Sequence, residues 1–126
     1  MDIAILGKTS IKIKGKKASF IVDPAKDMPK VSSDAIILLN GDTNIDISRV
    51  TDSRMVIAGP GGYEVGGVKI SGASTPKGTL YKLSIDDVVV VLGRATDSKL
   101  EGFNACQVAI VNADSDVESF VTALEP

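Results

Sequence analysis

The chain has 126 residues, 44% of them apolar, a formal net charge of −2 and no histidine, a composition typical of one globular domain. Without histidine, a Ser-His-Asp triad, a Cys-His pair and a histidine-bound zinc are all excluded. Cys106 is the single cysteine, which excludes an intrachain disulfide and a thiolate zinc cage.

The first third of the chain reads as short strands. Ile3–Leu6 is an apolar run, and Ile11–Lys14 alternates with a period of two, which indicates a half-buried strand. Gly15 and Lys16 supply a turn, and Ala18–Val22 returns as the second arm of a hairpin. Asp23-Pro24 ends this strand, and a loop is expected as far as Lys30.

The middle of the chain continues this pattern. Ala35–Leu39 is an uninterrupted apolar run, typical of a strand buried on both faces. Turn-forming residues fill Asn40–Asn44, and a short helical turn is predicted over Ile47–Val50. Met55–Ala58 is a further strand, and the glycines of Gly59–Gly62 are interpreted as holding a sharp turn.

The remaining elements are two hairpins, one buried strand and two helices. The hairpins join Tyr63–Val65 to Val68–Ile70 and Thr79–Ile85 to Val88–Leu92, the strand is Val108–Val111, and helical character is predicted at Thr96–Gly102 and from Ser115 to Leu124. Ser115 and Glu118 form a capping-box pattern at the start of the last helix. Strands therefore dominate the predicted structure.

Several motifs in this order resemble the metallo-β-lactamase-fold hydrolases, in the branch of the ascorbate-phosphate lactonases and predicted zinc-dependent hydrolases. Residues 1–13 resemble M-D-I-x-W-L-G-H-S-x-F-x-I, and Val22–Pro24 matches T-D-P. Ile57–Val65 is similar to I-x-G-P-G-E-Y-E-V, and Val91–Gly93 stands where the family has H-L-G-D. The resemblance implies an α/β, strand-rich fold of mostly antiparallel sheets with few helices. It would be a truncated αββα sandwich, forming one domain over residues 1–126 that lacks the family's C-terminal portion.

The resemblance also shows what this chain lacks. The family's metal loop reads H-x-H-x-D-H, and Gly41, Thr43 and Asp46 stand where its three histidines would be, with Asp42 between the first two. The family's bridging aspartate falls on Arg94, a permanent cation. A histidine near the N-terminus is replaced by Lys8. We therefore expect no family-type zinc site and no cofactor.

Removing a metal leaves carboxylates without a counter-charge, which is costly where they are buried. We hypothesise that Arg94, helped by Lys8, pairs with Asp42 or Asp46 and takes over the electrostatic role of the cation. The alternative is that all four side chains are solvated and unpaired.

Three functions remain open at this point. The first is a non-catalytic module that binds a partner or acts as a scaffold. The second is a residual hydrolase in which Asp42, Asp46 and Asp97 bind Mg²⁺ or Mn²⁺. The third is a sensor in which Lys8 and Arg94 bind a phosphate or carboxylate in the former metal pocket.

Partners and location follow from charge and pattern. The lysines at 8, 12, 14, 16 and 17 have no interleaved aromatic residues, so we interpret them as a solvated strand face or edge protection and expect no nucleic-acid partner. The longest apolar run, Val88–Leu92, is too short to span a membrane, and the N-terminus has no signal-peptide pattern, so we expect a cytoplasmic protein. A sandwich lacking its closing segment would expose apolar surface, so we also expect a twofold homodimer.

Overall fold

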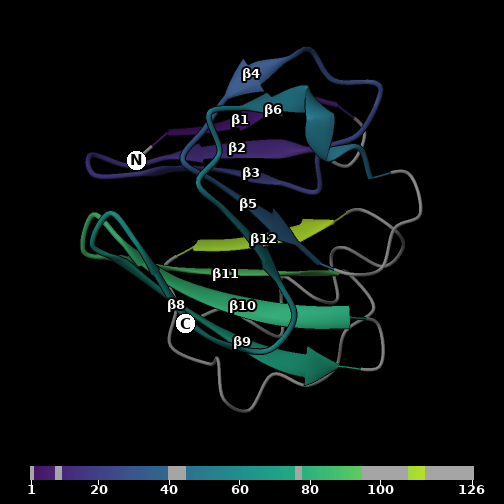
Figure 1. Cartoon of the computed structure of the whole chain (residues 1–126). Coiled ribbons are helices and arrows are strands. Elements are labelled where there is room, and N and C mark those ends of the chain that lie inside the picture. Colours follow the sequence, from purple (N-terminus) through teal and green to yellow (C-terminus); the bar gives the residue numbers. More distant parts are fainter. Residues whose placement is uncertain (1, 8–9, 40–44, 76–77, 95–107, 113–126) are drawn as a thin grey trace.

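Two five-stranded sheets make up the molecule (Figure 1). The computed structural model describes residues 2–7, 10–39, 45–75, 78–94 and 108–112. The first sheet has the strand order β1–β2–β3–β5–β7, and the second has the order β12–β11–β10–β9–β8. The strands of the first sheet are β1 (Asp2–Ile5), β2 (Ile11–Lys14), β3 (Ser19–Val22), β5 (Ala35–Leu38) and β7 (Met55–Ala58). Those of the second are β8 (Gly61–Val65), β9 (Val68–Thr75), β10 (Gly78–Ile85), β11 (Val88–Arg94) and β12 (Val108–Asn112).

Antiparallel pairs are the more numerous among the described strands. They join β1 to β2, β2 to β3, β8 to β9, β9 to β10 and β10 to β11. The parallel pairs are β3 with β5, β5 with β7, β11 with β12, and the short strands β4 (Val31–Ser32) with β6 (Val50–Thr51). The predicted strand-rich, mostly antiparallel class is confirmed.

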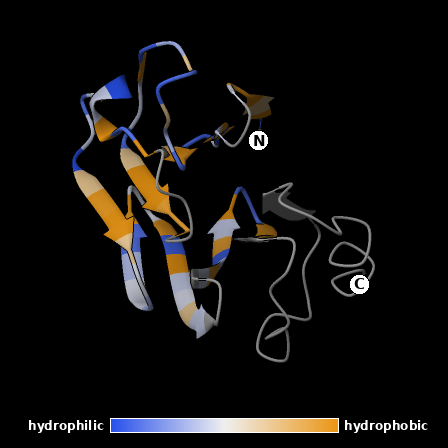
Figure 2. Ribbon diagram, turned by 90° about the vertical axis from the view of Figure 1, so that its right-hand side faces the viewer, coloured by the Kyte–Doolittle hydropathy of each residue, from blue (hydrophilic) through white to orange (hydrophobic). Residues whose placement is uncertain are grey.

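The period-two pattern of the strands builds the core between the two sheets. Phe20 and Val22 of β3 and Ile37 of β5 face Leu83 of β10 and Val90 of β11 in one buried cluster. Successive side chains of a strand point to opposite faces, so each strand contributes every second residue to this cluster. In the hydropathy colouring, apolar segments along the strands stand beside neutral and hydrophilic ones (Figure 2).

A second, smaller cluster lies on the outer face of the first sheet. Ile21 and Ile36 of the sheet pack there with Met28 and Val50. These last two residues belong to the loop after β3 and to β6. In the described part of the chain, short strands and the 3₁₀ helix η1 (Ile47–Arg49) accompany this face, where an αββα sandwich would have an α-helix.

The predicted elements agree closely with those observed. The strands at residues 11–14 and 55–58 have the predicted bounds, and all three predicted hairpins form. The short strands β4 and β6 were not predicted, because two-residue segments carry no periodic signal. The helices predicted at 96–102 and 115–124 lie outside the described residues. No helix in the described part of the chain is long and apolar enough to cross a bilayer.

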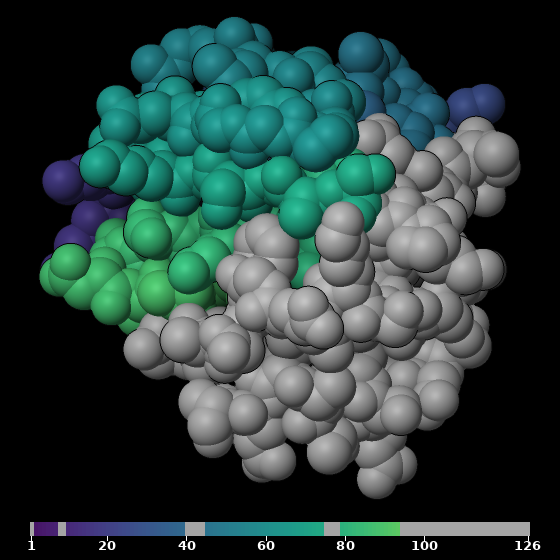
Figure 3. All heavy atoms as spheres, turned by 90° about the horizontal axis from the view of Figure 1, so that it is seen from below, coloured from purple at the N-terminus to yellow at the C-terminus, as the bar shows by residue number. Residues whose placement is uncertain are grey.

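The turns of the β2–β3, β8–β9 and β10–β11 hairpins meet at one end of the sandwich. At the centre of the β10–β11 turn, Asp86 and Asp87 both have positive φ, 51° and 62°, as a two-residue hairpin turn requires. Lys16, in the β2–β3 turn, donates its backbone N–H to Asp86 Oδ1 at 3.0 Å. In the space-filling view the N-terminal segments and the β10–β11 segment lie side by side (Figure 3). The hydrogen bond from Lys16 N to Asp86 Oδ1 therefore joins the two sheets at the end where the hairpin turns lie.

Asp34 fixes the start of β5 against β3. Its Oδ2 accepts hydrogen bonds from Ser19 N at 2.8 Å and Ser19 Oγ at 3.2 Å, and Arg54 lies 3.2 Å from its Oδ1. The backbone N–H of Ser19 is the main cause that lowers the pKa of Asp34 below its ordinary value. The folded state therefore favours the ionised carboxylate.

Because the pKa of Asp34 is lower in the folded state, its stabilising effect is present above the unfolded pKa and is lost as the pH falls through the folded pKa. We expect Asp34→Asn to lower the urea denaturation midpoint at about pH 7. The difference between the midpoints of the variant and the unchanged protein should be smaller at about pH 2.5, where Asp34 is protonated in the unfolded chain. Asp87→Asn, at an exposed turn position, is the control and should leave the midpoint unchanged. A gap of equal size at both pH values would contradict the assignment.

Candidate functional site

The carboxyl ends of β3, β5 and β7 lie at one edge of the first sheet, because these strands are parallel neighbours. Ligands of α/β sheets bind at the carboxyl ends of parallel strands. The segments that leave this edge begin with Asp23, Leu39 and Gly59. Residues 41–46, which the motif resemblance aligns with the family's metal loop, follow two residues after the end of β5. We treat this end of the first sheet as the candidate site and call it the candidate edge; it is distinct from the edge strands β1 and β7.

Asp23 is the fully buried polar residue at the end of β3. Its Oδ1 accepts a hydrogen bond from Leu39 N at 2.9 Å, and its own N–H donates to Ile37 O at 3.0 Å. Its carbonyl accepts from the buried Ser10 Oγ at 2.7 Å. The backbone φ of Asp23 is +49°, a left-handed value that turns the chain sharply before Pro24. Asp23 thus ties three segments of the first sheet together.

Leu39 connects the two sheets at this edge. Its N–H is held by Asp23, and its carbonyl accepts a hydrogen bond from Thr79 N of β10 at 3.0 Å. Both Leu39 and Thr79 are buried, so these hydrogen bonds are shielded from water. The start of the loop that follows β5 is therefore fixed from both sheets.

The far end of that loop is fixed as well. Ile45 forms a β-bridge with Ala25, and Asp46 N donates to Pro24 O at 2.8 Å. Residues 45 and 46 therefore lie beside the turn that follows Asp23. The described residues on both sides of 40–44 belong to one hydrogen-bonded framework.

Tyr81 of β10 crosses from the second sheet to the first. Its ring is fully buried, and its hydroxyl donates to Leu38 O at 2.8 Å and accepts from Gly59 N at 2.9 Å. Burial raises the pKa of this hydroxyl above its ordinary value of 10.0, against the opposing effect of the Gly59 N–H. The hydroxyl therefore stays protonated and keeps its donor function at neutral pH.

The second tyrosine holds the turn between β7 and β8. Gly59 and Gly61 have φ values of +107° and +137°, which side chains rarely adopt. Tyr63, partly buried against the core, donates its hydroxyl to Gly59 O at 3.0 Å. The sharp turn predicted for these glycines is confirmed at Gly59, while Gly61 and Gly62 begin β8.

Asp46 has a local structural role. Its Oδ1 accepts hydrogen bonds from Ser48 Oγ at 2.5 Å and Ser48 N at 3.1 Å, which caps η1, and Arg49 Nε lies 3.8 Å from Oδ2. The Ser48 hydroxyl is the main cause that lowers the pKa of Asp46. This carboxylate is therefore already engaged by its own helix.

The other predicted site residues divide into two groups. Lys8, Gly41, Asp42 and Thr43 lie outside the described residues, as do Asp97 and Cys106. Arg94 is the last residue of β11, two positions after Leu92, which pairs with Tyr81. The backbone of Arg94 thus reaches the candidate edge, but the structure does not describe its side chain. Its ion pair with Asp42 or Asp46 stays a prediction.

A family-type zinc does not fit the donors that this chain offers. Structural and catalytic zinc sites use histidine, cysteine or carboxylate ligands, with at least three from the protein. The chain has no histidine, and the described residues contain no group of three histidine, cysteine or acidic side chains that could hold a metal. Asp46, the described acidic residue of the loop, is occupied by Ser48 and Arg49.

Sequence reasoning missed four residues of this edge. Ser10, Leu39, Thr79 and Tyr81 form contacts across loops or between sheets, with sequence separations of up to 43 residues. A tyrosine in an apolar strand needs a partner for its hydroxyl, so Tyr81 carried a usable signal. The other three had none that a single sequence provides.

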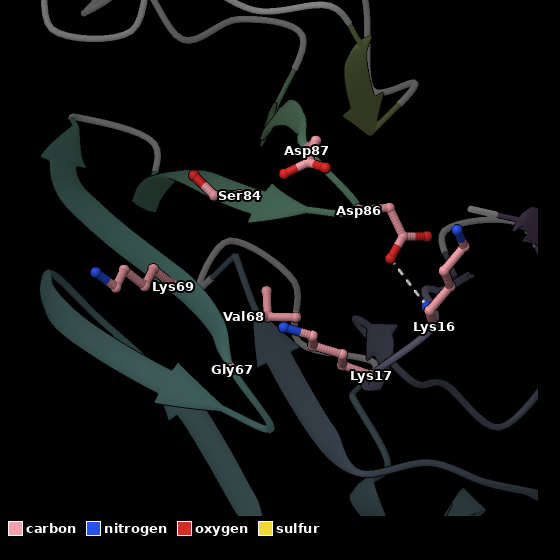
Figure 4. A pocket seen from close by; sticks show the side chains of 8 residues that line it. All are labelled: Lys16, Lys17, Gly67, Val68, Lys69, Ser84, Asp86 and Asp87. Atoms are coloured by element: carbon pink, nitrogen blue, oxygen red, sulfur yellow. Dashed lines mark hydrogen bonds between the residues drawn. The ribbon is translucent and has the colours of Figure 1, made fainter.

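A pocket lies at the turn end of the sandwich, away from the carboxyl ends of β3, β5 and β7 (Figure 4). It has a volume of about 330 Å³ and is lined by Lys16, Lys17, Gly67, Val68, Lys69, Ser84, Asp86 and Asp87. The Lys16 N–H is the main cause that lowers the pKa of Asp86. Its three lysines are exposed and its charges have both signs, so this pocket favours no single class of ligand.

No protein-family model and no curated protein sequence matches the chain. Solved structures do. A protein of Thermotoga maritima, provisionally named a Zn-dependent hydrolase of the metallo-β-lactamase superfamily, has 20% identity and a TM-score of 0.72, over 97% of this chain and 69% of that one. A provisionally named metal-dependent hydrolase of Parabacteroides distasonis has 13% identity and a TM-score of 0.66, over 98% and 87%.

A metallo-β-lactamase of Cronobacter sakazakii, mutated in its HARLDQ motif, is also similar. It has 11% identity and a TM-score of 0.53, over 87% of this chain and 76% of that one. Similarity at such low identity concerns the fold and carries no activity with it. The chain therefore has the metallo-β-lactamase fold, as its sequence motifs predict.

Proposed function

We propose that the protein is a non-catalytic module with the metallo-β-lactamase fold, acting through binding or as a scaffold. The observation that carries this proposal is the absence of histidine from all 126 residues. The solved structures of this fold include proteins provisionally named as zinc- or metal-dependent hydrolases. In such enzymes a bound metal lowers the pKa of water and generates the nucleophile.

The residues at the candidate edge support the same proposal. Asp23 and Tyr81 are buried and use their polar atoms to connect strands, so their oxygens serve the fold. Asp46 caps η1. A hydrolase needs a nucleophile and a group to activate it within hydrogen-bonding reach. The polar side chains described at this edge instead make hydrogen bonds that hold the strands and η1 in place.

Two other functions would use the same edge. A residual hydrolase would bind Mg²⁺ or Mn²⁺ through Asp42, Asp46 and Asp97, and an anion sensor would bind phosphate or carboxylate through Lys8 and Arg94. Each of these two functions requires a ligand, a divalent cation or an anion, whose binding can be measured. One set of binding experiments therefore distinguishes all three functions.

The test is metal analysis of the purified protein combined with thermal unfolding. We expect much less than one zinc, iron, manganese or magnesium per chain, and no shift of Tm with Zn²⁺, Mn²⁺, Mg²⁺ or inorganic phosphate. A ligand present at a hundredfold its Kd would add about 2.7 kcal/mol and raise Tm measurably.

Variants identify the function if a shift is found. A Mn²⁺ or Mg²⁺ shift that disappears in Asp42→Asn would replace the proposal by the residual hydrolase. A phosphate shift that disappears in Arg94→Gln would replace it by the anion sensor. A stoichiometric metal together with hydrolysis of a phosphorylated lactone would overturn the proposal outright.

A further inference from the structure

β1 forms an open edge of the first sheet (Figure 1). It pairs with β2 on one side, and all four of its residues are exposed. A strand at the end of a sheet presents backbone N–H and C=O groups that can pair with another strand. Asp2–Ile5 contains no proline and no lysine, which are common means of protecting such an edge. Of the lysines predicted to protect an edge, Lys12 and Lys14 are on β2, one strand further in.

The inner face of β1 is apolar and uncovered. Ile3 pairs with the buried Ile13, and Ile5 pairs with Ile11, which packs against the core. Directly paired residues share a face of the sheet, so Ile3 and Ile5 point to the same side as the core. Their exposed fractions are nevertheless 43% and 82%. The core face of the first sheet thus continues onto β1 as an exposed apolar strip.

We propose that β1 pairs antiparallel with β1 of a second copy of this chain, about a twofold axis at Ile3. This arrangement would join the two first sheets into one sheet of ten strands. A twofold pairing closes after two copies, whereas pairing of β1 with an opposite edge would continue into a fibre.

Charge complementarity selects this register. With the axis at Ile3, Asp2 lies opposite Ala4 of the second copy. Ala4 pairs with Lys12 within each copy, so Lys12 of the second copy lies on the same face, about 10 Å from Asp2 across two strand spacings. Its long side chain can extend over the small Ala4 to the carboxylate. Asp2 also pairs with Lys14 of its own chain, so each Asp2 would lie between two cations.

The neighbouring register is less favourable. An axis at Ala4 would place Asp2 opposite the apolar Leu6 and would set the Lys12 residues of both copies on either side of a pair of alanines. Like charges on one face oppose pairing, while opposite charges favour it. Ile3 would then pair with Ile5 of the second copy, so apolar contact is available in both registers and the charges decide between them.

The opposite edge strand, β7, is the less suitable surface. Its exposed apolar residues, Met55 and Val56, are adjacent in sequence and so point to opposite faces. Ser53 Oγ also donates to Met55 O at 3.1 Å, which engages one carbonyl of this strand. Val56, with an exposed fraction of 45%, therefore provides a control matched to Ile3.

The first test is the solution mass over a range of protein concentrations, by sedimentation equilibrium. An edge of four residues makes a small interface, and small interfaces are weak and transient. We therefore expect a reversible rise from monomer towards dimer mass. Ile3→Lys should weaken association at least tenfold, and Val56→Lys should leave it unchanged. A monomer at every concentration, or equal weakening by both variants, would overturn the proposal.

The second test reads the register directly and requires no stable dimer. In a Cys106→Ser background, Ile3→Cys should form an intermolecular disulfide under mild oxidation, because cross-strand partners meet the spacing that a disulfide needs. Val56→Cys should not cross-link at the same rate. Faster cross-linking of Ala4→Cys than of Ile3→Cys would refute the register with the axis at Ile3.

A charge exchange tests the electrostatic part. Asp2→Lys should weaken dimer formation, and adding Lys12→Asp should restore it by recreating the opposite-charge contact in reverse. Failure of the second change to restore association would exclude the Asp2–Lys12 contact and, with it, this register. Circular dichroism of each variant confirms that the monomer remains folded.

Discussion

Replacing Phe20 with alanine should lower the free energy of unfolding by about 3–5 kcal/mol. Phe20 is fully buried and is one of the two largest side chains of the core. It extends from β3 into the cluster to which both sheets contribute. Removing the ring deletes its apolar contacts and leaves a cavity that the surrounding strands can only partly fill.

Urea denaturation followed by circular dichroism measures this change. Val56→Ala is the control, because the Val56 side chain lies on an exposed edge strand and its loss should cost no more than about 0.5 kcal/mol. A loss below about 1 kcal/mol for Phe20→Ala would show that the two sheets do not enclose this ring as described.

Local patterns were sufficient to predict most of the strands. The alternation of Ile11–Lys14 fixed both the bounds of β2 and the direction of its lysines, since Ile13 is buried and Lys14 is exposed. The unbroken apolar run at Ala35–Leu39 contains the strand β5 (Ala35–Leu38), which is buried on both faces, with Ile37 in one cluster and Ile36 in the other. These predictions succeeded because strand periodicity is encoded within a few residues.

The contacts of the candidate edge could not be predicted in this way. Leu39 is an ordinary apolar residue in the sequence, yet its N–H and carbonyl are bound by Asp23 and Thr79, from two different sheets. Which residues meet there depends on how the sheets are stacked, a property of the whole fold. The motif resemblance aligned residues 41–46 with the metal loop, but it gave no partner for Asp23.

Asp46 makes contacts that its alignment with the metal loop does not indicate. It stands where the resembling family has a histidine, and the sequence suggested that it either balances a cation or is solvated. Its side chain instead contacts Ser48 and Arg49, which follow it within one turn. Aspartate is a favoured residue at the start of a helix, so this short-range use was available from the sequence.

Replacing Tyr81 with phenylalanine should cost about 1–3 kcal/mol, although it removes a single oxygen atom. The Tyr81 hydroxyl serves Leu38 O and Gly59 N at once; Tyr81 is fully buried, and both hydrogen bonds are partly buried. Without it, a carbonyl of the first sheet and an N–H of the β7–β8 turn each lose their partner, which costs more than the average hydrogen bond contributes. Tyr63→Phe should cost less, because the Tyr63 hydroxyl is partly exposed and the carbonyl it leaves can bind water.

Alkaline pH gives Tyr81→Phe a readout that loss of packing would not produce. The pKa of Tyr81 is raised in the folded state above 10.0, so its contribution is complete below the unfolded pKa and is lost as the pH rises through the folded pKa. The native chain should therefore lose stability steeply above about pH 10, and Tyr81→Phe should lose less over the same range, so that the two denaturation midpoints converge. Parallel curves for the two proteins would contradict the buried, hydrogen-bonded state of this hydroxyl. Tyr63→Phe, measured in the same series, should keep the steep decline because Tyr81 is still present.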